Sequence, residues 1–157
     1  MAGQALEQMD MTPQPARAPV LRVLVVDDEP LIRWSLAEAL GARGYDVVES
    51  GDARGARNAV REAAIDFDVV ILDYRLPDSG DLSLLVSIRR QLPRAHVILM
   101  TAFGTSELVR DALDLGAFRV IGKPFDLEEF SDLVGEAAML SSGGTSSKAT
   151  KPQSKSV

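Results

Sequence analysis

The sequence predicts an α/β protein in which a doubly wound, five-stranded parallel sheet carries helices on both faces. Five short apolar segments alternate with five segments of helical periodicity, and strands separated by helices pair in parallel. The strongest apolar segments are continuous instead of alternating, which is typical of strands buried on both sides.

The first half of the chain supplies two strands and two helices. The apolar run at 21–26 is rich in branched side chains and predicts a buried strand. Pro30 suits a first helical turn, apolar residues recur at helical spacing after it, and Gly44 is typical of a helix end. Residues 46–50 then predict a short strand, and residues 53–64 predict a helix rich in alanine and arginine.

The second half continues the alternation. Residues 68–73 form a continuous apolar run that ends in an acid, and Pro93 blocks continuation of the helix expected at 81–91. The other expected elements are a turn at 77–80, a strand at 96–100, a helix at 105–115 that stops at Gly116, a weaker strand at 118–122, and an amphipathic helix at 126–139 with Asp126 as its N-cap.

The composition indicates one folded domain with disordered ends. The chain has 157 residues, of which 46% are apolar and 25% charged, as is ordinary for a globular protein. Residues 1–19 contain three prolines and lack periodicity, and residues 141–157 are rich in serine, glycine and lysine. We therefore expect a domain at 20–140 between a disordered extension and a disordered tail or linker.

Composition also excludes several classes of site and partner. There is no cysteine, and the single histidine, His96, cannot build a multi-histidine metal site. No apolar run is long enough to span a membrane and no secretory leader is present, which favours a cytoplasmic protein. The net charge is -6; the ends carry -1 and +3, which leaves -8 on residues 20–140. Such an acidic body disfavours nucleic-acid binding.

Polar residues stop the apolar runs at positions that should meet in space. Asp27 and Asp28 follow the first strand, Asp73 ends the third, Thr101 follows the fourth and Lys123 follows the fifth. Carboxyl ends of parallel strands share one edge of a sheet, and ligands bind at that edge. We expect these five residues to form one pocket.

The chemistry of this pocket favours phosphoryl transfer. Three carboxylates repel one another unless a cation intervenes, and oxygen ligands favour Mg²⁺. Lys123 adds a positive charge and Thr101 a hydroxyl donor, while a carboxylate attacks phosphorus. The sequence has no GxxxxGK[ST] motif, so a nucleotide held in a Walker loop is not the expected phosphate donor.

Four fragments carry a resemblance to a known family. The segments VVDDEP (25–30), ILDYRLPDSG (71–80), MTAFG (100–104) and GKPF (122–125) resemble those of the receiver domain of bacterial two-component response regulators. The fragments occur in the family's order, each after an expected strand, and the resemblance covers about residues 21–139. It implies a flavodoxin-like sheet with strand order 2-1-3-4-5.

The resemblance implies a role for each pocket residue. Asp73 would accept a phosphoryl group from a histidine kinase or phosphotransfer protein. Asp28 and Asp73 would bind Mg²⁺ directly, Asp27 would act through water, and the backbone carbonyl of Arg75 would complete the protein ligands. The remaining two, Thr101 and Lys123, would contact the phosphoryl group, and the Lys123–Pro124 peptide would be the family's cis bond.

Several residues also have plain structural explanations. The acid pair Asp27 and Asp28 suits the start of a helix, whose dipole favours negative charge. His96 opens a strand far from the pocket and is expected to be structural. Trp34 lies near the start of the first helix, where it either packs or faces a partner. The side chain of Arg75 either overhangs the pocket and biases dephosphorylation or faces solvent.

One position departs from the family pattern. Receivers usually carry tyrosine or phenylalanine three residues before the lysine, and that ring turns inward when the threonine moves towards the phosphoryl group. Here the position is Val120, which is stiff and small. Phe118 would share its strand face if the strand began there. We therefore expect the relay from Asp73 to the surface to be weakened or altered.

Alternative functions remain open at this point. The domain acts as a phosphorylation-dependent binding module, as a phosphate sink or relay intermediate, or as an interaction domain that does not need phosphate. It is not expected to be a turnover enzyme, and Arg75 stands where aspartyl-nucleophile phosphatases have a second aspartate. The family often dimerises through the segment that corresponds to 105–139. No output domain follows residue 140, so the chain is either a stand-alone receiver or a piece of a longer regulator.

Overall fold

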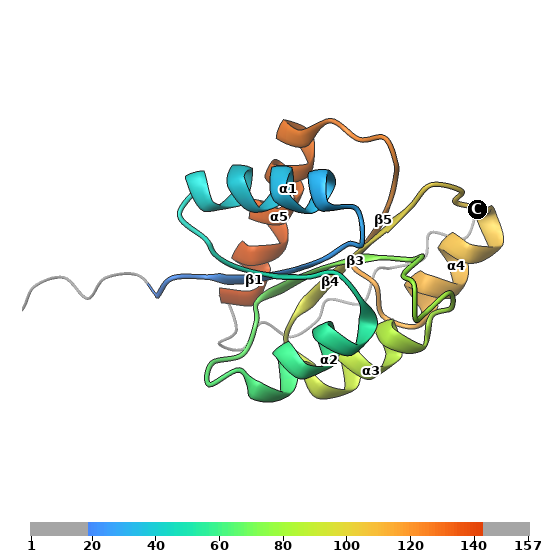
Figure 1. Ribbon diagram of the computed structural model, residues 1–157, viewed down its shortest axis with the longest axis horizontal. Helices are drawn as coiled ribbons and strands as arrows, with labels where there is room; N and C mark the ends of the chain where they lie inside the picture. Colours follow the sequence, from blue (N-terminus) through green and yellow to red (C-terminus); the bar gives the residue numbers. More distant parts are fainter. Residues whose placement is uncertain (1–18, 143–157) are drawn as a thin grey trace, which may run out of the picture.

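The computed structural model describes residues 19–142, which form a five-stranded parallel sheet with the strand order β2-β1-β3-β4-β5 (Figure 1). The predicted fold class and strand order are confirmed. The strands are β1 (Arg22–Val26), β2 (Asp46–Ser50), β3 (Val69–Asp73), β4 (His96–Thr101) and β5 (Arg119–Gly122). The helices are α1 (Pro30–Ala42), α2 (Ala53–Glu62), α3 (Ser83–Gln91), α4 (Ser106–Asp114) and α5 (Leu127–Ser142).

The sheet separates two apolar cores. Helices α1 and α5 cover one face, and α2, α3 and α4 cover the other (Figure 1). Successive residues of a strand point to opposite faces, so in β1 Val23 and Val25 join the first core while Leu24 and Val26 join the second. Central strands buried on both sides explain why their sequences are apolar without alternation.

Two helix ends show why glycine stands there. Gly44 and Gly116 follow α1 and α4 with φ of 91° and 101°, values that side chains with a Cβ rarely adopt. At the start of α5, the Asp126 carboxylate accepts the Glu129 N–H at 2.9 Å, which is the N-cap contact predicted for it.

The last strand begins one residue later than predicted, and this changes where Phe118 points. β5 starts at Arg119, so Phe118 precedes the regular strand. Its ring packs with the α1 and α5 core, edge-on to the His96 ring at 5.1 Å, whereas Val120 packs with the opposite core. The expectation that Phe118 shares a face with Val120 is therefore wrong.

The last helix runs through Ser142, beyond the boundary predicted at residue 140. Its final turn is held by Ser141, whose hydroxyl donates to the Asp68 carbonyl at 2.9 Å and lies 2.6 Å from Nδ1 of His96. His96 opens β4, at the end of the sheet opposite Asp73, and burial and then the Arg89 charge lower its pKa. Disorder was predicted for 1–19 and 141–157, which lie outside the described residues apart from positions 19, 141 and 142.

Replacing Ser141 by alanine is expected to lower the free energy of unfolding by about 1 kcal/mol, because the Asp68 carbonyl and His96 lose a shared partner. Chemical denaturation would measure the change. The Ser87→Ala variant is the matched control, since Ser87 is also helical but its hydroxyl meets only the exposed side chain of Gln91. Equal effects of the two substitutions would contradict a role for Ser141 in closing the last turn.

Among residues 19–142, no helix combines the length and the apolar character needed to cross a membrane.

Candidate functional site

The carboxyl ends of the strands bring the predicted polar residues to one edge of the sheet. Asp73, the last residue of β3, lies beside Met100 of β4, and Thr101 at the end of β4 lies beside Gly122 of β5. The Lys123 N–H donates to the Thr101 carbonyl at 2.8 Å, which extends this ladder by one residue. Sheet pairing alone therefore places Asp73, Thr101 and Lys123 within one small area.

Lys123 forms the centre of the site. Its Nζ donates to Oδ2 of Asp27 at 2.8 Å and to Oδ2 of Asp73 at 3.0 Å, and it lies 3.4 Å from Oε1 of Glu29. Asp27 is fully buried, Asp73 is 6% exposed, and Glu29 is exposed. One ammonium therefore faces three carboxylates, of which two are buried.

Burial and charge shift the pKa values of this cluster. Burial raises the pKa of Asp73 to about 6. The Lys123 hydrogen bond opposes this rise, and the Asp27 charge adds to it. Burial also acts to lower the pKa of Lys123, but hydrogen bonds to Asp27 and Asp73 outweigh it and leave that pKa above its usual range. The lysine therefore stays charged, and Asp73 is ionised at neutral pH at a cost in free energy.

Thr101 supplies a buried hydroxyl at the edge of the cluster. The side chain is 3% exposed, and its Oγ1 accepts the Phe103 N–H at 3.2 Å. A hydroxyl that accepts one hydrogen bond keeps its own proton to donate. The ring of Phe103, by contrast, is 78% exposed.

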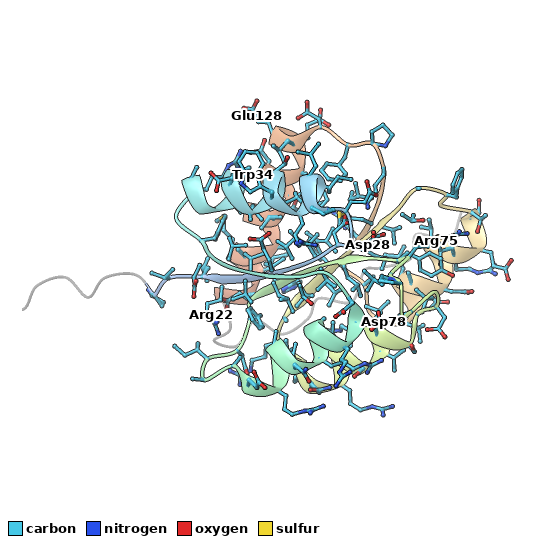
Figure 2. All side chains as sticks on the ribbon, in the orientation of Figure 1. Arg22, Asp28, Trp34, Arg75, Asp78 and Glu128 are labelled. Carbon is cyan, nitrogen blue, oxygen red and sulfur yellow. The ribbon has the colours of Figure 1, made fainter. Side chains whose placement is uncertain are left out.

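Two of the residues predicted for the metal site lie at its margin. Asp28 is exposed, and its carboxylate is not in the group formed by Asp27, Glu29 and Asp73, whose oxygens lie within 4.8 Å of one another. Arg75 is exposed and its N–H donates to Oδ1 of Asp73 at 3.3 Å. Figure 2 shows Asp28 and Arg75 towards the same end of the sheet. Metal contacts by Asp28 and by the Arg75 carbonyl stay predictions.

Sequence reasoning missed two residues of the site. Glu29 directly follows the acid pair, and its position in VVDDEP was the available signal. Arg33 lies one helical turn later on α1, where its Nη1 donates to the backbone carbonyl of Asp27 at 2.7 Å and its Nε lies 3.5 Å from Glu49. Arg33 thus holds the backbone of Asp27, a contact that no local pattern reveals.

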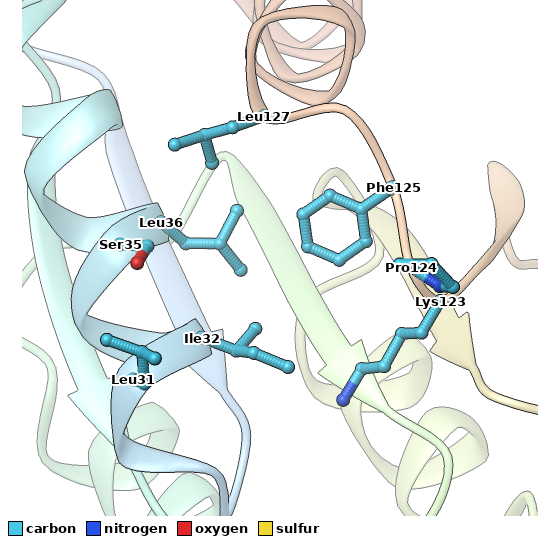
Figure 3. Close-up of a pocket in the computed structure, with 8 residues that line it drawn as sticks. All are labelled: Leu31, Ile32, Ser35, Leu36, Lys123, Pro124, Phe125 and Leu127. Atoms are coloured by element: carbon cyan, nitrogen blue, oxygen red, sulfur yellow. The ribbon is translucent and has the colours of Figure 1, made fainter.

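An apolar pocket of about 300 Å³ adjoins the site between α1 and the loop that leads from β5 to α5 (Figure 3). Lys123 lies at its rim, Leu36 and Phe125 line it, and the Lys123–Pro124 peptide beside it is cis, as the resemblance implied. On the outer surface of α1, Leu31 is 73% and Trp34 57% exposed. Trp34 therefore presents its indole to solvent, which favours the partner-facing interpretation over packing.

The donor set fits a hard divalent cation. Asp27, Glu29 and Asp73 offer carboxylate oxygens and no nitrogen or sulfur ligand, which is the preference of Mg²⁺. The three acids carry more negative charge than Lys123 balances, so a bound cation would relieve their repulsion.

Comparison with known proteins agrees with this geometry. The chain matches the family described as the response regulator receiver domain over residues 23–135. It is 37% identical over 121 residues to the regulatory protein AtoC of Escherichia coli, covering 77% of this chain and 26% of that protein. It is 40% identical over 108 residues to the transcriptional regulatory protein KdpE of Mycobacterium tuberculosis, covering 69% and 46%. The chain thus spans only a quarter to a half of the length of these relatives.

Solved structures show the same fold. A CheY-like receiver domain protein from Methanospirillum hungatei superposes with a TM-score of 0.76 at 24% identity, covering 81% of this chain and 100% of that one. The chemotaxis response regulator CheY4 of Vibrio cholerae gives a TM-score of 0.69 at 26% identity, covering 76% and 99%. With the sheet order, the acidic pocket and the family match in agreement, this chain belongs to the receiver domain family of two-component response regulators, which are phosphoryl-accepting signalling domains and not classical enzymes.

Proposed function

We propose that Asp73 accepts a phosphoryl group from the phosphohistidine of a kinase or phosphotransfer protein, in a reaction that needs Mg²⁺. The observation that carries the proposal is the pairing of buried Asp73 with Lys123 at 3.0 Å, beside the second buried acid Asp27. A structural ion pair needs only one acid to balance a lysine, whereas Lys123 lies within 4.0 Å of three carboxylates.

The chain supplies the nucleophile and part of the charge stabilisation for the transfer. A carboxylate oxygen of Asp73 attacks phosphorus, the P–N bond to the donor imidazole breaks, and the imidazole leaves with the electron pair. Lys123 stays charged and balances the negative charge on the equatorial oxygens of the phosphoryl group. The Thr101 hydroxyl donates a hydrogen bond to one of these oxygens. Mg²⁺ held by Asp27, Asp73 and either Asp28 or Glu29 would supply the remaining positive charge.

The surface around Asp73 suits delivery from a protein donor. A partner that brings a phosphohistidine to Asp73 must cover the adjoining surface, and α1 presents exposed Leu31 and Trp34 beside the apolar pocket. Exposed apolar side chains next to a reactive pocket are typical of protein interaction sites. We assign this side of the domain to the kinase or phosphotransfer partner.

Incubation with Mg²⁺ and a small acyl phosphate is expected to add one phosphoryl group to the chain, and peptide mapping should place it on Asp73. The Asp73→Asn variant should show no adduct, because an amide is not a nucleophile for this reaction. The matched control is Asp114→Asn, which removes an exposed acid of α4 and should label normally. An adduct on another residue, or unchanged labelling of Asp73→Asn, would contradict the proposal.

Val120 favours a second candidate, in which partner binding depends little on phosphate. Phe118 packs in the opposite core, so it cannot replace the missing ring at Val120. We expect titration with a phosphoryl mimic and Mg²⁺ to shift amide resonances near Asp73 and Thr101 but to shift those of residues 105–122 weakly. Large shifts throughout 105–122, equal to those around the pocket, would show that the relay is intact.

A further inference from the structure

Helices α2 and α3 differ in charge from α1 and α5, which lie on the opposite face of the sheet. Helices α2 and α3 together contain five arginines and one glutamate, whereas α1 and α5 contain five acidic residues and one arginine. The surface of α2 and α3 is therefore the most basic part of an acidic protein, although α4 on the same face carries three acids and one arginine.

This basic surface is most regular on α2. Arg54, Arg57 and Arg61 are spaced by three and four residues, so they form one stripe about 10 Å long along the helix. Within residues 19–142, no acidic side chain pairs with any of the three at 4.0 Å or less, although arginines on other elements do form ion pairs: Arg22, Arg33, Arg43 and Arg119. Arg57 interacts electrostatically with Asp78 and Asp81, but none of the three guanidinium groups is held in a close ion pair, so they can bind an external anion.

The stripe borders a hollow of about 390 Å³, whose far wall is the loop from β3 to α3. The loop contributes Asp78 and Ser79 to this wall, and Ser83 at the start of α3 completes it. The two carboxylate oxygens of Asp78 accept the N–H groups of Ala53 and Arg54 at 2.8 and 3.0 Å, and these hydrogen bonds, together with the Arg57 charge, lower the pKa of Asp78. Asp78 thus holds the wall against the first turn of α2.

We propose that the arginine stripe of α2, with the hollow beside it, is a docking surface for an acidic segment of a partner protein. Guanidinium groups bind carboxylates through paired N–H donors, and a helix or extended segment can present several carboxylates at the spacing of the stripe. Continuous phosphate backbones fit less well, because they would extend from this short stripe onto the acidic remainder of the surface.

The proposed docking surface lies beside the loop that follows Asp73, but the proposal does not depend on the chemistry of Asp73. The hollow's far wall belongs to the loop that begins directly after Asp73, and Leu76 and Ser79 fix that loop by two backbone hydrogen bonds of 2.8 and 3.2 Å. A partner bound here would contact this loop. The inference does not rest on phosphate acceptance, so binding is tested on the unphosphorylated, metal-free chain.

The probe is a labelled alanine-rich peptide with glutamates at i, i+3 and i+7, and its binding is measured by fluorescence anisotropy. The triple variant Arg54→Gln, Arg57→Gln, Arg61→Gln should weaken binding about tenfold or more. The matched control removes three exposed arginines elsewhere (Arg90→Gln, Arg94→Gln, Arg110→Gln), with the same change in net charge, and should weaken binding less than about twofold. Circular dichroism would verify that both variants fold.

Amide resonances of residues 53–62 and 77–83 should shift when the peptide is added to the wild type. The proposal is overturned if both triple variants lose affinity equally, since that would show nonspecific attraction, or if no binding occurs at low salt. Tighter binding of an oligonucleotide that depends on the stripe would assign the surface to nucleic acid instead. Self-association that the α2 variant alone abolishes would assign it to a second copy of the chain.

Discussion

Replacing Lys123 by methionine is expected to lower the free energy of unfolding of the metal-free domain by about 3 kcal/mol at neutral pH. Methionine keeps much of the apolar stem but removes the charge that Asp27 and Asp73 share at 2.8 and 3.0 Å. Both acids are buried, so without the lysine each either carries a charge that lacks its main partner or takes up a proton, and both outcomes cost free energy. Urea denaturation at fixed pH measures the loss.

The matched control for this variant is Arg43→Met, which breaks the exposed pair with Asp132 at 2.8 Å. Because both partners of that pair meet solvent, its loss should cost less than about 1 kcal/mol. Added Mg²⁺ should restore more stability to Lys123→Met than to the wild type, since the lysine no longer competes for the carboxylates. Equal losses in the two variants would mean that the cluster contributes no more than a surface ion pair.

The sequence predicted the sheet more completely than it predicted the pocket. The strands could be predicted because a buried parallel strand requires a continuous apolar run. The acid or hydroxyl that ends each run then had to lie at the carboxyl-terminal edge of the sheet. Asp73, Thr101 and Lys123 could therefore be placed together. Their backbone contacts, such as the Lys123 N–H on the Thr101 carbonyl, follow from the same ladder.

What the sequence could not foretell depends on side-chain direction and on contacts between distant segments. Phe118 was misplaced because it precedes the regular strand, so the alternation of faces that holds within a strand does not fix its direction. Glu29 and Arg33 were missed because the turn between β1 and α1 sets their direction towards Lys123 and the Asp27 carbonyl. Ser141 looked like part of a polar tail, although its hydroxyl meets Asp68 and His96, far away in the sequence.

Replacing Asp73 by asparagine is expected to stabilise the metal-free domain at neutral pH while it removes phosphate acceptance. The pKa of Asp73 is raised from 3.8 to about 6 in the folded state, chiefly by burial, so at neutral pH the folded protein bears the cost of ionising it. At about 1.4 kcal/mol for each pKa unit, the gain in the free energy of unfolding should be about 1–3 kcal/mol. Asparagine keeps the shape and a carbonyl oxygen for Lys123, whose other buried acid, Asp27, remains.

The dependence on pH distinguishes this explanation from a general effect of substitution. Because the folded-state pKa of Asp73 lies above the unfolded one, wild-type folding takes up a proton between about pH 4 and pH 6, and its stability falls as pH rises through that window. The difference between Asp73→Asn and wild type should thus be full above about pH 6 and disappear near pH 4. Urea denaturation across this range measures it, with Asp114→Asn as the control of equal charge change. A difference that stays constant over the range would show that the ionisation of Asp73 costs the fold nothing, and its burial beside Asp27 would then need another explanation.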